Sequence, residues 1–437
     1  MSRPRDLLNC PGAVRHDDWG TLRRWRGSRQ RDPRDAACQL GSDRPHDNLR
    51  GPQEADVLKR RSRHGYIGVD IGAAGVRVLQ LVDCDGEPAV QAAAHYEFPA
   101  GAGPDERCEL VPGILREALS RHAFCGREAV AALGIGEFQM KNIRLPKMPA
   151  EELDTAVQFE AQDRFELGGM PAQFRYLPAG EVRHGNELKE EVIVFSAVEE
   201  KITERLALLH AAGLRPVAMD ITPCAIARSF VRFLRRGEDV NAVNIFIDVG
   251  RTGSTIVITR GTDLSFLKII DIGGDHMNAA VAKALNLSRE EAADLRVRIM
   301  HEGDGRRATD RPIVADEIRA RVLDAVRPQV ERISRDVQLC LRYFAVTFRG
   351  QRPDSLTFVG GEAHEPALRQ IFSSAIDIPS MIGHPLRGVR RAELTAARNE
   401  RTLQPAWAVA TGLALRGSPW VRVSRQTPAI AASALAT

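Results

Sequence analysis

One short pattern occurs twice in this chain of 437 residues and constrains its fold more than any other feature. The pattern Asp-x-Gly-x-x-Gly runs from Asp70 to Gly75 and again from Asp248 to Gly253, at an offset of 178 residues and without a gap. An apolar run precedes each copy and a β-rich run follows it. Each copy therefore predicts a β-hairpin with an acidic, glycine-rich tip.

Such a tip has the chemistry of a phosphate site. Glycine lets the backbone take positive φ and approach a ligand, so that N–H groups point at phosphate oxygens, while an aspartate can hold a hydrated Mg²⁺. One copy alone is equally typical of an ordinary turn between strands. Two copies in register favour a paired site that clamps a nucleotide. It is not a P-loop, because the sequence contains no G-x-x-x-x-G-K-[ST].

Composition narrows the class of protein. With 43% hydrophobic and 27% charged residues the chain is globular, and its net charge of +4 implies neither a nucleic acid nor an anionic membrane as partner. No stretch of about eighteen apolar residues is long enough to span a bilayer. The seven cysteines are scattered without a C-x-x-C pair, which predicts free thiols in a reducing cytosol and no zinc site.

The chain divides into an unusual N-terminal part and a regular remainder. Residues 1–64 are rich in Arg, Asp, Pro and Gly and lack periodicity, so we predict a disordered basic extension, and a misassigned start codon is one explanation for it. From Gly65 onward, predicted strands and helices alternate in two similar halves. This alternation indicates two α/β domains that flank a cleft.

Four segments carry a resemblance to a known superfamily. Residues 66–81 and 246–255 look like two phosphate loops, residues 358–368 look like an adenosine motif, and residues 408–415 look like a closing helix. Over residues 65–417 the chain resembles the actin-like ATPases. Within them it is more similar to the type IV pilus assembly PilM family than to the cell-division protein FtsA, because residues 145–165 and 208–220 match the pilus-type signature.

The resemblance implies an α/β, actin-like (ribonuclease H-like) duplicated two-domain fold around a nucleotide cleft. Domain I would span residues 65–242, with a small inserted subdomain at about residues 99–190. Domain II would span residues 243–385, followed by a return segment and closing helix at 386–417 and a tail at 418–437.

The resemblance also implies ATP and Mg²⁺ as cofactors, with Mg²⁺ held by Asp70 and Asp248 through nucleotide and water. The implied nucleotide-binding residues are Asp70, Gly72, Ala73, Ala74, Gly75, Arg77, Asp248, Gly250, Thr252, Gly253, Ser254, Arg296, Gly360 and Gly361.

Three departures from the family pattern bear on hydrolysis and binding. Ala73, Ala74 and Gly75 stand where serines are usual, which removes hydroxyl donors but keeps backbone donors. Thr222 occupies the usual position of a Glu or Gln that orients water, and Arg296 replaces a lysine near the ribose. The sequence therefore assigns no catalytic residue and predicts ATP binding with weak or absent ATPase activity.

The resemblance implies a scaffold for a type IV pilus or a related secretion machine. It implies a cytoplasmic protein at the inner membrane, held there by the tail of a PilN-like single-span protein in a groove of domain I. The apolar face of Leu153, Val157 and Ala161 in residues 137–165 is either part of that partner surface or ordinary core. A homo-oligomer is left open. Two alternatives are a phosphotransferase of the same superfamily and an FtsA-like membrane tether, although Pro428 interrupts the terminal segment that a tether would need.

Overall fold

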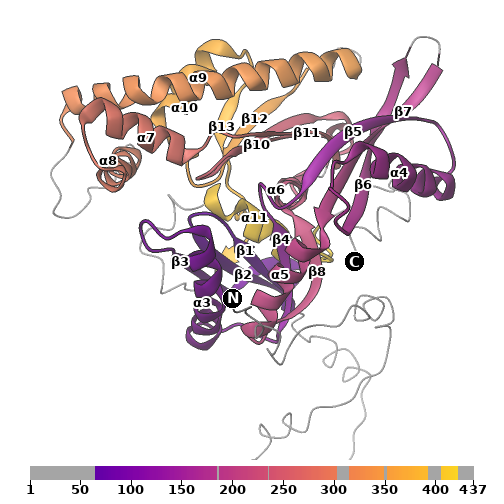
Figure 1. The fold of residues 1–437 in the computed structure, drawn as a ribbon, viewed down its shortest axis with the longest axis horizontal. Helices are drawn as coiled ribbons and strands as arrows, with labels where there is room; N and C mark the ends of the chain where they lie inside the picture. Colours follow the sequence, from indigo (N-terminus) through magenta and orange to yellow (C-terminus); the bar gives the residue numbers. More distant parts are fainter. Residues whose placement is uncertain are drawn as a thin grey trace, which may run out of the picture. The chain divides into compact units, whose positions relative to one another are not determined.

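The computed structural model describes residues 64–184, 187–234, 236–302, 314–348, 352–391 and 405–421. Residues 1–63 of the predicted extension and residues 422–437 of the predicted tail lie outside the described residues, as do Cys10 and Cys38. The five cysteines within the described residues are free thiols. Strands and helices alternate along the described chain and form three sheets, of six, five and three strands (Figure 1).

The first sheet has the strand order β14-β3-β2-β1-β4-β8. Strands β1 and β2 form the first predicted hairpin and β3 extends it antiparallel, while β4 and β8 continue the sheet in parallel on the other side of β1. The bounds are β1 (His64–Ile71), β2 (Gly75–Cys84), β3 (Glu87–Glu97), β4 (Glu128–Leu133), β8 (Arg215–Ile221) and β14 (Arg390–Arg391).

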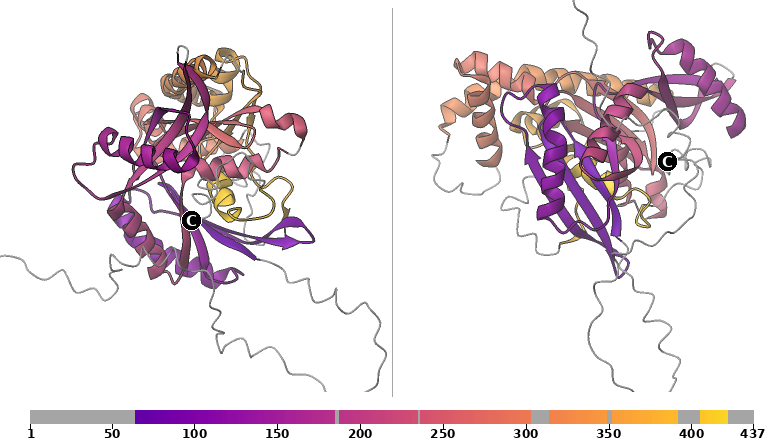
Figure 2. Two further views of the ribbon diagram at one scale, coloured as in Figure 1. Left: turned by 90° about the vertical axis from the view of Figure 1, so that its right-hand side faces the viewer. Right: turned by 60° about the horizontal axis from the view of Figure 1, so that its bottom comes forward.

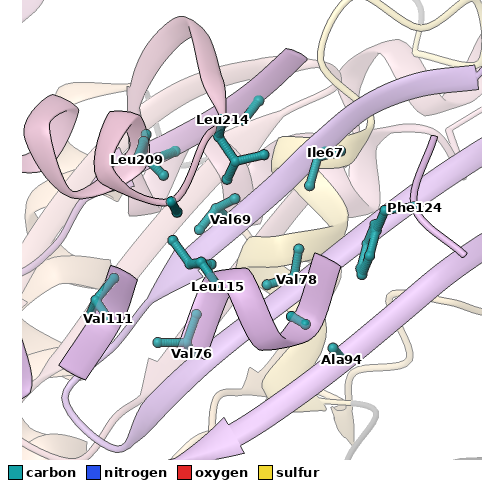
Figure 3. Close-up of a cluster of buried hydrophobic side chains, with 14 of the residues drawn as sticks. Ile67, Val69, Val76, Val78, Ala94, Val111, Leu115, Phe124, Leu209 and Leu214 are labelled. Carbon is teal, nitrogen blue, oxygen red and sulfur yellow. The ribbon is translucent and has the colours of Figure 1, made fainter. Parts of the chain in front are cut away.

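Both faces of this sheet are buried. Successive side chains of a strand point to opposite faces, so Ile67 and Val69 lie with Val76 and Val78 under helices α3 (Pro104–Arg121) and α5 (Glu199–Ala211) (Figure 3). The opposite face, which includes Leu79, packs against helix α11 (Ala408–Ala414). The sequence predicts a helix over residues 111–122, and α3 begins seven residues earlier because Pro104 is suited to the first helical position.

A small three-stranded sheet is inserted between β4 and α5. It consists of β5 (Gln139–Pro146), β6 (Ala172–His184) and β7 (Glu187–Val198) in the order β5-β7-β6, with helix α4 (Ala150–Arg164) on one face. The sequence placed this subdomain at about residues 99–190. The structure differs because α3 and β4 pack into the first domain, so the separate sheet spans residues 139–198.

The apolar face of α4 forms the core of this subdomain. Leu153, Val157 and Ala161 are each at most 2% exposed and pack against Ile143 and Leu145 of β5. These five side chains are therefore not available to a partner, and core packing is the interpretation that holds for this face.

The second sheet has the order β11-β10-β9-β12-β13. Its central strands β9 and β10 form the second predicted hairpin, and β12 pairs in parallel with β9. The bounds are β9 (Val243–Val249), β10 (Ser254–Arg260), β11 (Asp263–Ile270), β12 (Ser355–Val359) and β13 (Ser380–Ile382). Four helices belong to this half, namely α7 (Gly274–Leu285), α8 (Arg289–Glu302), α9 (Asp316–Thr347) and α10 (Pro366–Ala375).

The sequence predicts several helices between Asp316 and Phe348, but the structure has one continuous helix, α9. Figures 1 and 2 show it as one long helix beside the second sheet. Pro328 lies inside it, but Val326 and Val330 on either side keep the buried face in phase. Burial of this face outweighs the local preference of proline to end a helix.

Helices α6 (Thr222–Val231) and α11 connect the two larger sheets. Phe230 of α6 stacks on Phe246 of β9, with ring centroids 4.8 Å apart. Helix α11 approaches both β1 and α6 so closely that a Cβ on Gly68 or Gly412 would overlap the neighbouring backbone. The short 3₁₀ helices η2 (Gly237–Asn241) and η3 (Pro405–Trp407) complete the described elements.

Candidate functional site

The two hairpin tips are built alike. In the first, the Gly72 N–H donates to the Gly75 carbonyl, and in the second the Gly250 N–H donates to the Gly253 carbonyl, each over 3.0 Å. Asp70 lies opposite Arg77 in its hairpin, and Asp248 lies opposite Thr255 at the same offset. The duplication seen in the sequence therefore extends to strand register and to the hydrogen bond that closes each tip.

The charge of the first tip's aspartate, Asp70, acts on the aspartate of the second tip, Asp248. Burial raises the pKa of Asp248, and the negative charge of Asp70 raises it further, against the opposing effect of Arg77, to about 7. Burial also raises the pKa of Asp70, while Arg77 and Arg205 act to lower it. The compensation of the Asp70 charge is weak, because its ion-pair partner Arg77 has its Nη1 3.9 Å from Asp70 Oδ2 and Arg205 acts on it only electrostatically. Two neighbouring carboxylates, one buried and one half-buried, with so little compensation form a site that favours a cation.

The predicted adenosine motif lies directly against the second tip. Val359, the last residue of β12, is the register partner of Asp248, and Gly360 follows with φ of +91°. A Cβ on Gly360 would overlap Asp248 Oδ1 and lie 2.5 Å from the Val249 carbonyl oxygen, so a side chain is excluded there. Gly361 faces open space, with no atom within 4 Å of its Cβ position.

Helix α7 also begins on the second tip. The Gly274 N–H donates to the Gly250 carbonyl over 3.0 Å, and the Asp275 N–H donates to the Arg251 carbonyl over 2.8 Å. Gly273 is needed for this approach, because a Cβ would lie 2.5 Å from the Gly250 oxygen. The segment from Asp271 to Asp275 is thus the turn that leads into α7, and its backbone N–H groups hold the second tip in place.

Two residues that the resemblance assigns to the nucleotide have protein partners instead. The Ser254 hydroxyl is buried and donates to the Ile272 carbonyl over 2.6 Å. Arg296, 1% exposed, forms ion pairs with Glu362 at 2.7 Å and with Glu365 at 2.6 Å. Its Nη1 also donates to the Gly274 carbonyl and to the Asn278 side chain. These donors are already used in the structure, so the role of Arg296 is to hold α8 against the loop after β12.

The remaining implied residues of the tips, Ala73, Ala74 and Thr252, are at least partly exposed on the two turns. Backbone donors therefore dominate at the first tip, as expected from its lack of serines, and the second tip adds the exposed Thr252 hydroxyl.

Thr222 is the first residue of α6, immediately after the end of β8. The nearby carboxylate is Asp220, whose Oδ2 lies 2.8 Å from both Arg228 Nη1 and Arg416 Nη1. Burial acts to raise the pKa of Asp220, but the two guanidinium groups outweigh it and lower the pKa below its usual value. Asp220 is consequently an anion fixed between two cations and is poorly suited to accept a proton.

Sequence reasoning missed one ion pair beside the first tip. Arg205 of α5 is 8% exposed and donates to Glu137, whose other oxygen accepts the Gly134 N–H over 2.7 Å. Arg205 also acts electrostatically on Asp70. The same loop carries Ile135, whose side chain lies 3.2 Å from the Cβ position of Gly253, so this part of domain I touches the second tip. Nothing local in the sequence distinguishes these residues from surface charges.

Comparison with known protein families identifies the family of this chain. The model of the family described as type IV pilus assembly protein PilM matches residues 68–418. The chain belongs to this PilM family. It is similar to the solved structure titled "PilM-PilN type IV pilus biogenesis complex", with a TM-score of 0.65, 22% identity and coverage of 81% of this chain and 98% of that chain. The actin-like fold that the resemblance implies is thereby confirmed.

A second similar structure is that of the ethanolamine utilization protein EutJ from Carboxydothermus hydrogenoformans, with a TM-score of 0.47, 16% identity and coverage of 81% of this chain and 89% of that chain.

Two further observations concern metals and membranes. Within the described ranges, no group of three or more His, Cys, Asp or Glu side chains is arranged to hold a metal ion by itself. The two tip aspartates nevertheless fit a Mg²⁺ that keeps most of its ligands from phosphate and water, because Mg²⁺ needs only one or two protein carboxylates. Among the helices that the structure describes, none is both long enough and apolar enough to cross a membrane.

Proposed function

We propose that this PilM family member is an ATP-binding scaffold that recruits the cytoplasmic tail of a PilN-like membrane protein during type IV pilus assembly. The observation that carries the nucleotide part is the pair of hairpin tips with identical register, in which the charge of Asp70 adds to burial in raising the pKa of Asp248. Opposed phosphate loops of this kind would hold the phosphates through backbone N–H groups.

In this proposal the parts of the site have separate roles. The tips 72–75 and 250–253 bind phosphate, and Asp70 with Asp248 orients the hydrated Mg²⁺ that neutralises the phosphates. Gly361 leaves room for the base and ribose because it faces open space, and Gly360 lets the preceding turn pack against Asp248, since there is no space for a side chain at its position. The resemblance assigns Arg296 to the nucleotide, whereas its hydrogen bonds to Glu362 and Glu365 support a role in holding α8 in place.

Direct binding is the first test. Titration of the full chain with a fluorescent ATP analogue and Mg²⁺ should saturate, and Asp248→Ala should weaken binding by about 1 to 3 kcal/mol, the usual effect of losing a charge-assisted contact. Asp377→Ala, an exposed carboxylate on the same domain, is the matched control and should bind normally. Absence of saturable binding by the wild-type chain would contradict the nucleotide site.

Hydrolysis should be slow. Thr222 supplies no carboxylate, and Asp220 is fixed by Arg228 and Arg416, so no described group near α6 is suited to accept a proton from water. We expect steady-state turnover well below about 10 per second, the ordinary enzyme median. A phosphate-release assay on purified protein measures it, and rapid turnover without a partner would instead support a phosphotransferase or a true ATPase.

The partner part of the proposal is supported by the similarity to the PilM–PilN complex and by family membership. We expect the chain to be cytoplasmic and to reach the inner membrane only through the partner. Cell fractionation with and without the neighbouring single-span protein tests this. Membrane association that persists without that protein would favour the FtsA-like alternative, in which the chain anchors itself.

A further inference from the structure

Two helices of this chain expose apolar side chains surrounded by charges of one sign. On the C-terminal half of α9, Leu339 and Val346 are 54% and 85% exposed, and Arg332, Arg335 and Arg342 are exposed on the same side. Their spacing of three, four, three and four residues places them in one stripe along the helix. We call these five residues the basic face.

The second helix is α4. Phe159 is 69% exposed at its centre, and Glu151, Glu152 and Asp163 are exposed around it. Glu152, Phe159 and Asp163 share one side of the helix by the same spacing rule, while Leu153 and Val157 point to the opposite side and into the core. We call Glu151, Glu152, Phe159 and Asp163 the acidic face.

None of these charges is neutralised within the part of the chain that the structure describes. No ion pair within 4.0 Å involves the three arginines or the three acids. Glu331 and Asp336 flank the basic face but are half-buried beside it. An exposed apolar side chain is unremarkable when single, but apolar side chains set among unpaired charges of one sign are typical of a binding surface with a polar rim.

The two faces cannot meet within one chain. The three-stranded sheet lies between their helices: α4 packs on the sheet face that carries Ile143 and Val192, whereas α9 contacts the other face. There the Tyr343 hydroxyl donates to Glu191 over 2.9 Å, and Glu191 pairs with Arg144 at 2.7 Å. The ribbon views show α4 and α9 on different sides of this sheet (Figures 1 and 2).

We propose that the acidic face of one copy of this chain binds the basic face of another copy. The charges are complementary, and Phe159 would pack against Leu339 and Val346 inside the charged rim. Because the two patches differ, the contact is heterologous, so that each bound copy leaves one face free for a further copy. The inference does not depend on nucleotide binding, since neither face includes a residue of the hairpin tips.

Two complementary variants test the proposal in the full chain. Arg335→Glu with Arg342→Glu removes the basic face, and Glu152→Arg with Asp163→Arg removes the acidic face. By sedimentation velocity from about 1 to about 100 μM, the range of weak interfaces, the wild type should form oligomers that grow with concentration. Each variant alone should stay monomeric, and an equimolar mixture should assemble again, because the intact acidic face of one variant meets the intact basic face of the other and the two reversed faces are also complementary.

Two controls separate the contact from misfolding and from general charge effects. All four substituted positions are exposed, so the thermal midpoints should match that of the wild type. Lys283→Glu with Arg289→Glu makes the same charge change at exposed sites elsewhere and should leave assembly unchanged. Raising NaCl from about 0.05 to about 0.5 M should weaken the wild-type oligomers at least tenfold, because the rim charges are screened.

A wild type that stays monomeric at about 100 μM, or a mixture of the two variants that does not assemble, would overturn the proposal. So would binding of a monomeric wild type to phosphatidylserine vesicles that is lost in the Arg335→Glu, Arg342→Glu variant, since this result would assign the basic face to an anionic membrane.

Discussion

The repulsion between Asp70 and Asp248 at the two hairpin tips should make the stability of the protein depend on pH. The pKa of Asp248 is raised from 3.8 to about 7, so the folded chain holds this proton more tightly than the unfolded chain. The stability associated with the protonated group is fully present below about pH 4 and is lost as the pH rises through about 7. In the absence of nucleotide and metal, ionised Asp248 therefore destabilises the protein at neutral and alkaline pH.

The magnitude follows from the shift. A pKa difference of about three units corresponds to about 4 kcal/mol of unfolding free energy for a group that is fully shielded from solvent. Because the Asp248 side chain is partly exposed, we expect an effect of about 2 kcal/mol. Asp248→Asn keeps the size of the protonated side chain and cannot ionise. At pH 8.5 this variant should unfold with a free energy about 2 kcal/mol above that of the wild type, and near pH 4 the difference should vanish.

Urea unfolding followed by circular dichroism in EDTA, at both pH values, measures this difference, with Asp377→Asn as an exposed control. The same Asp248→Asn variant should bind Mg-ATP more weakly, so stability and binding should change in opposite directions. A variant that is no more stable than the wild type at pH 8.5 would refute the reasoning, because Asp248 would then carry no uncompensated charge.

Three further predictions test the surroundings of the tips. Gly360→Ala should lower the free energy of unfolding by about 2 to 4 kcal/mol in urea titrations, because the new Cβ would meet Asp248 and the φ of this residue is positive. The control Gly361→Ala should change the free energy of unfolding by less than about 0.5 kcal/mol. Equal effects of the two substitutions would show that the turn is not tightly packed. Arg296→Met should cost about 3 to 5 kcal/mol by leaving Glu362 and Glu365 without their cation, while Arg289→Met on the exposed start of the same helix should be nearly neutral. Burial, and then the charge of Arg77, lower the pKa of His95 to about 4, so the stability that neutral His95 contributes is present above about pH 6.5 and is lost as the pH falls towards 4. In His95→Gln, the loss of unfolding free energy on acidification should be smaller by about 1 to 2 kcal/mol. An unchanged pH profile of stability would contradict this prediction.

The features that the sequence predicts best are those with local causes. Each hairpin follows from an apolar run, a glycine-rich tip and a β-rich run, and β1, β2, β9 and β10 lie where that pattern places them. An apolar run also predicts a strand over residues 355–359, and β12 has these bounds. Strand β6 was missed, because Arg175, Pro178 and Gly180 interrupt its alternation and only pairing with β7 across a bulge makes it a strand.

The roles of buried charges could not be predicted, because their partners are distant in sequence. Arg296 has the local appearance of a surface residue in a polar helix, yet Glu365, 69 positions away, pairs with it inside the protein. Arg205 and Glu137 meet over 68 positions in the same way. A basic residue near a nucleotide motif therefore indicates a ligand contact only if the fold supplies no nearer carboxylate.

The carboxylates of Asp220, Asp70 and Asp248 differ in how closely arginines neutralise them. Asp220 and Asp70 are almost equally buried, at 8% and 7% exposure, yet the pKa of Asp220 is lowered and that of Asp70 is raised. Burial alone cannot cause opposite shifts, so the difference lies in the partners. Asp220 has two guanidinium groups at 2.8 Å, whereas Asp70 has one at 3.9 Å and Asp248 has none within 4.0 Å among the described residues. Since this fold pairs the buried acids Asp220 and Glu365 closely with arginines, the weakly compensated carboxylates of the two tips support the proposal of a cation that arrives with the ligand.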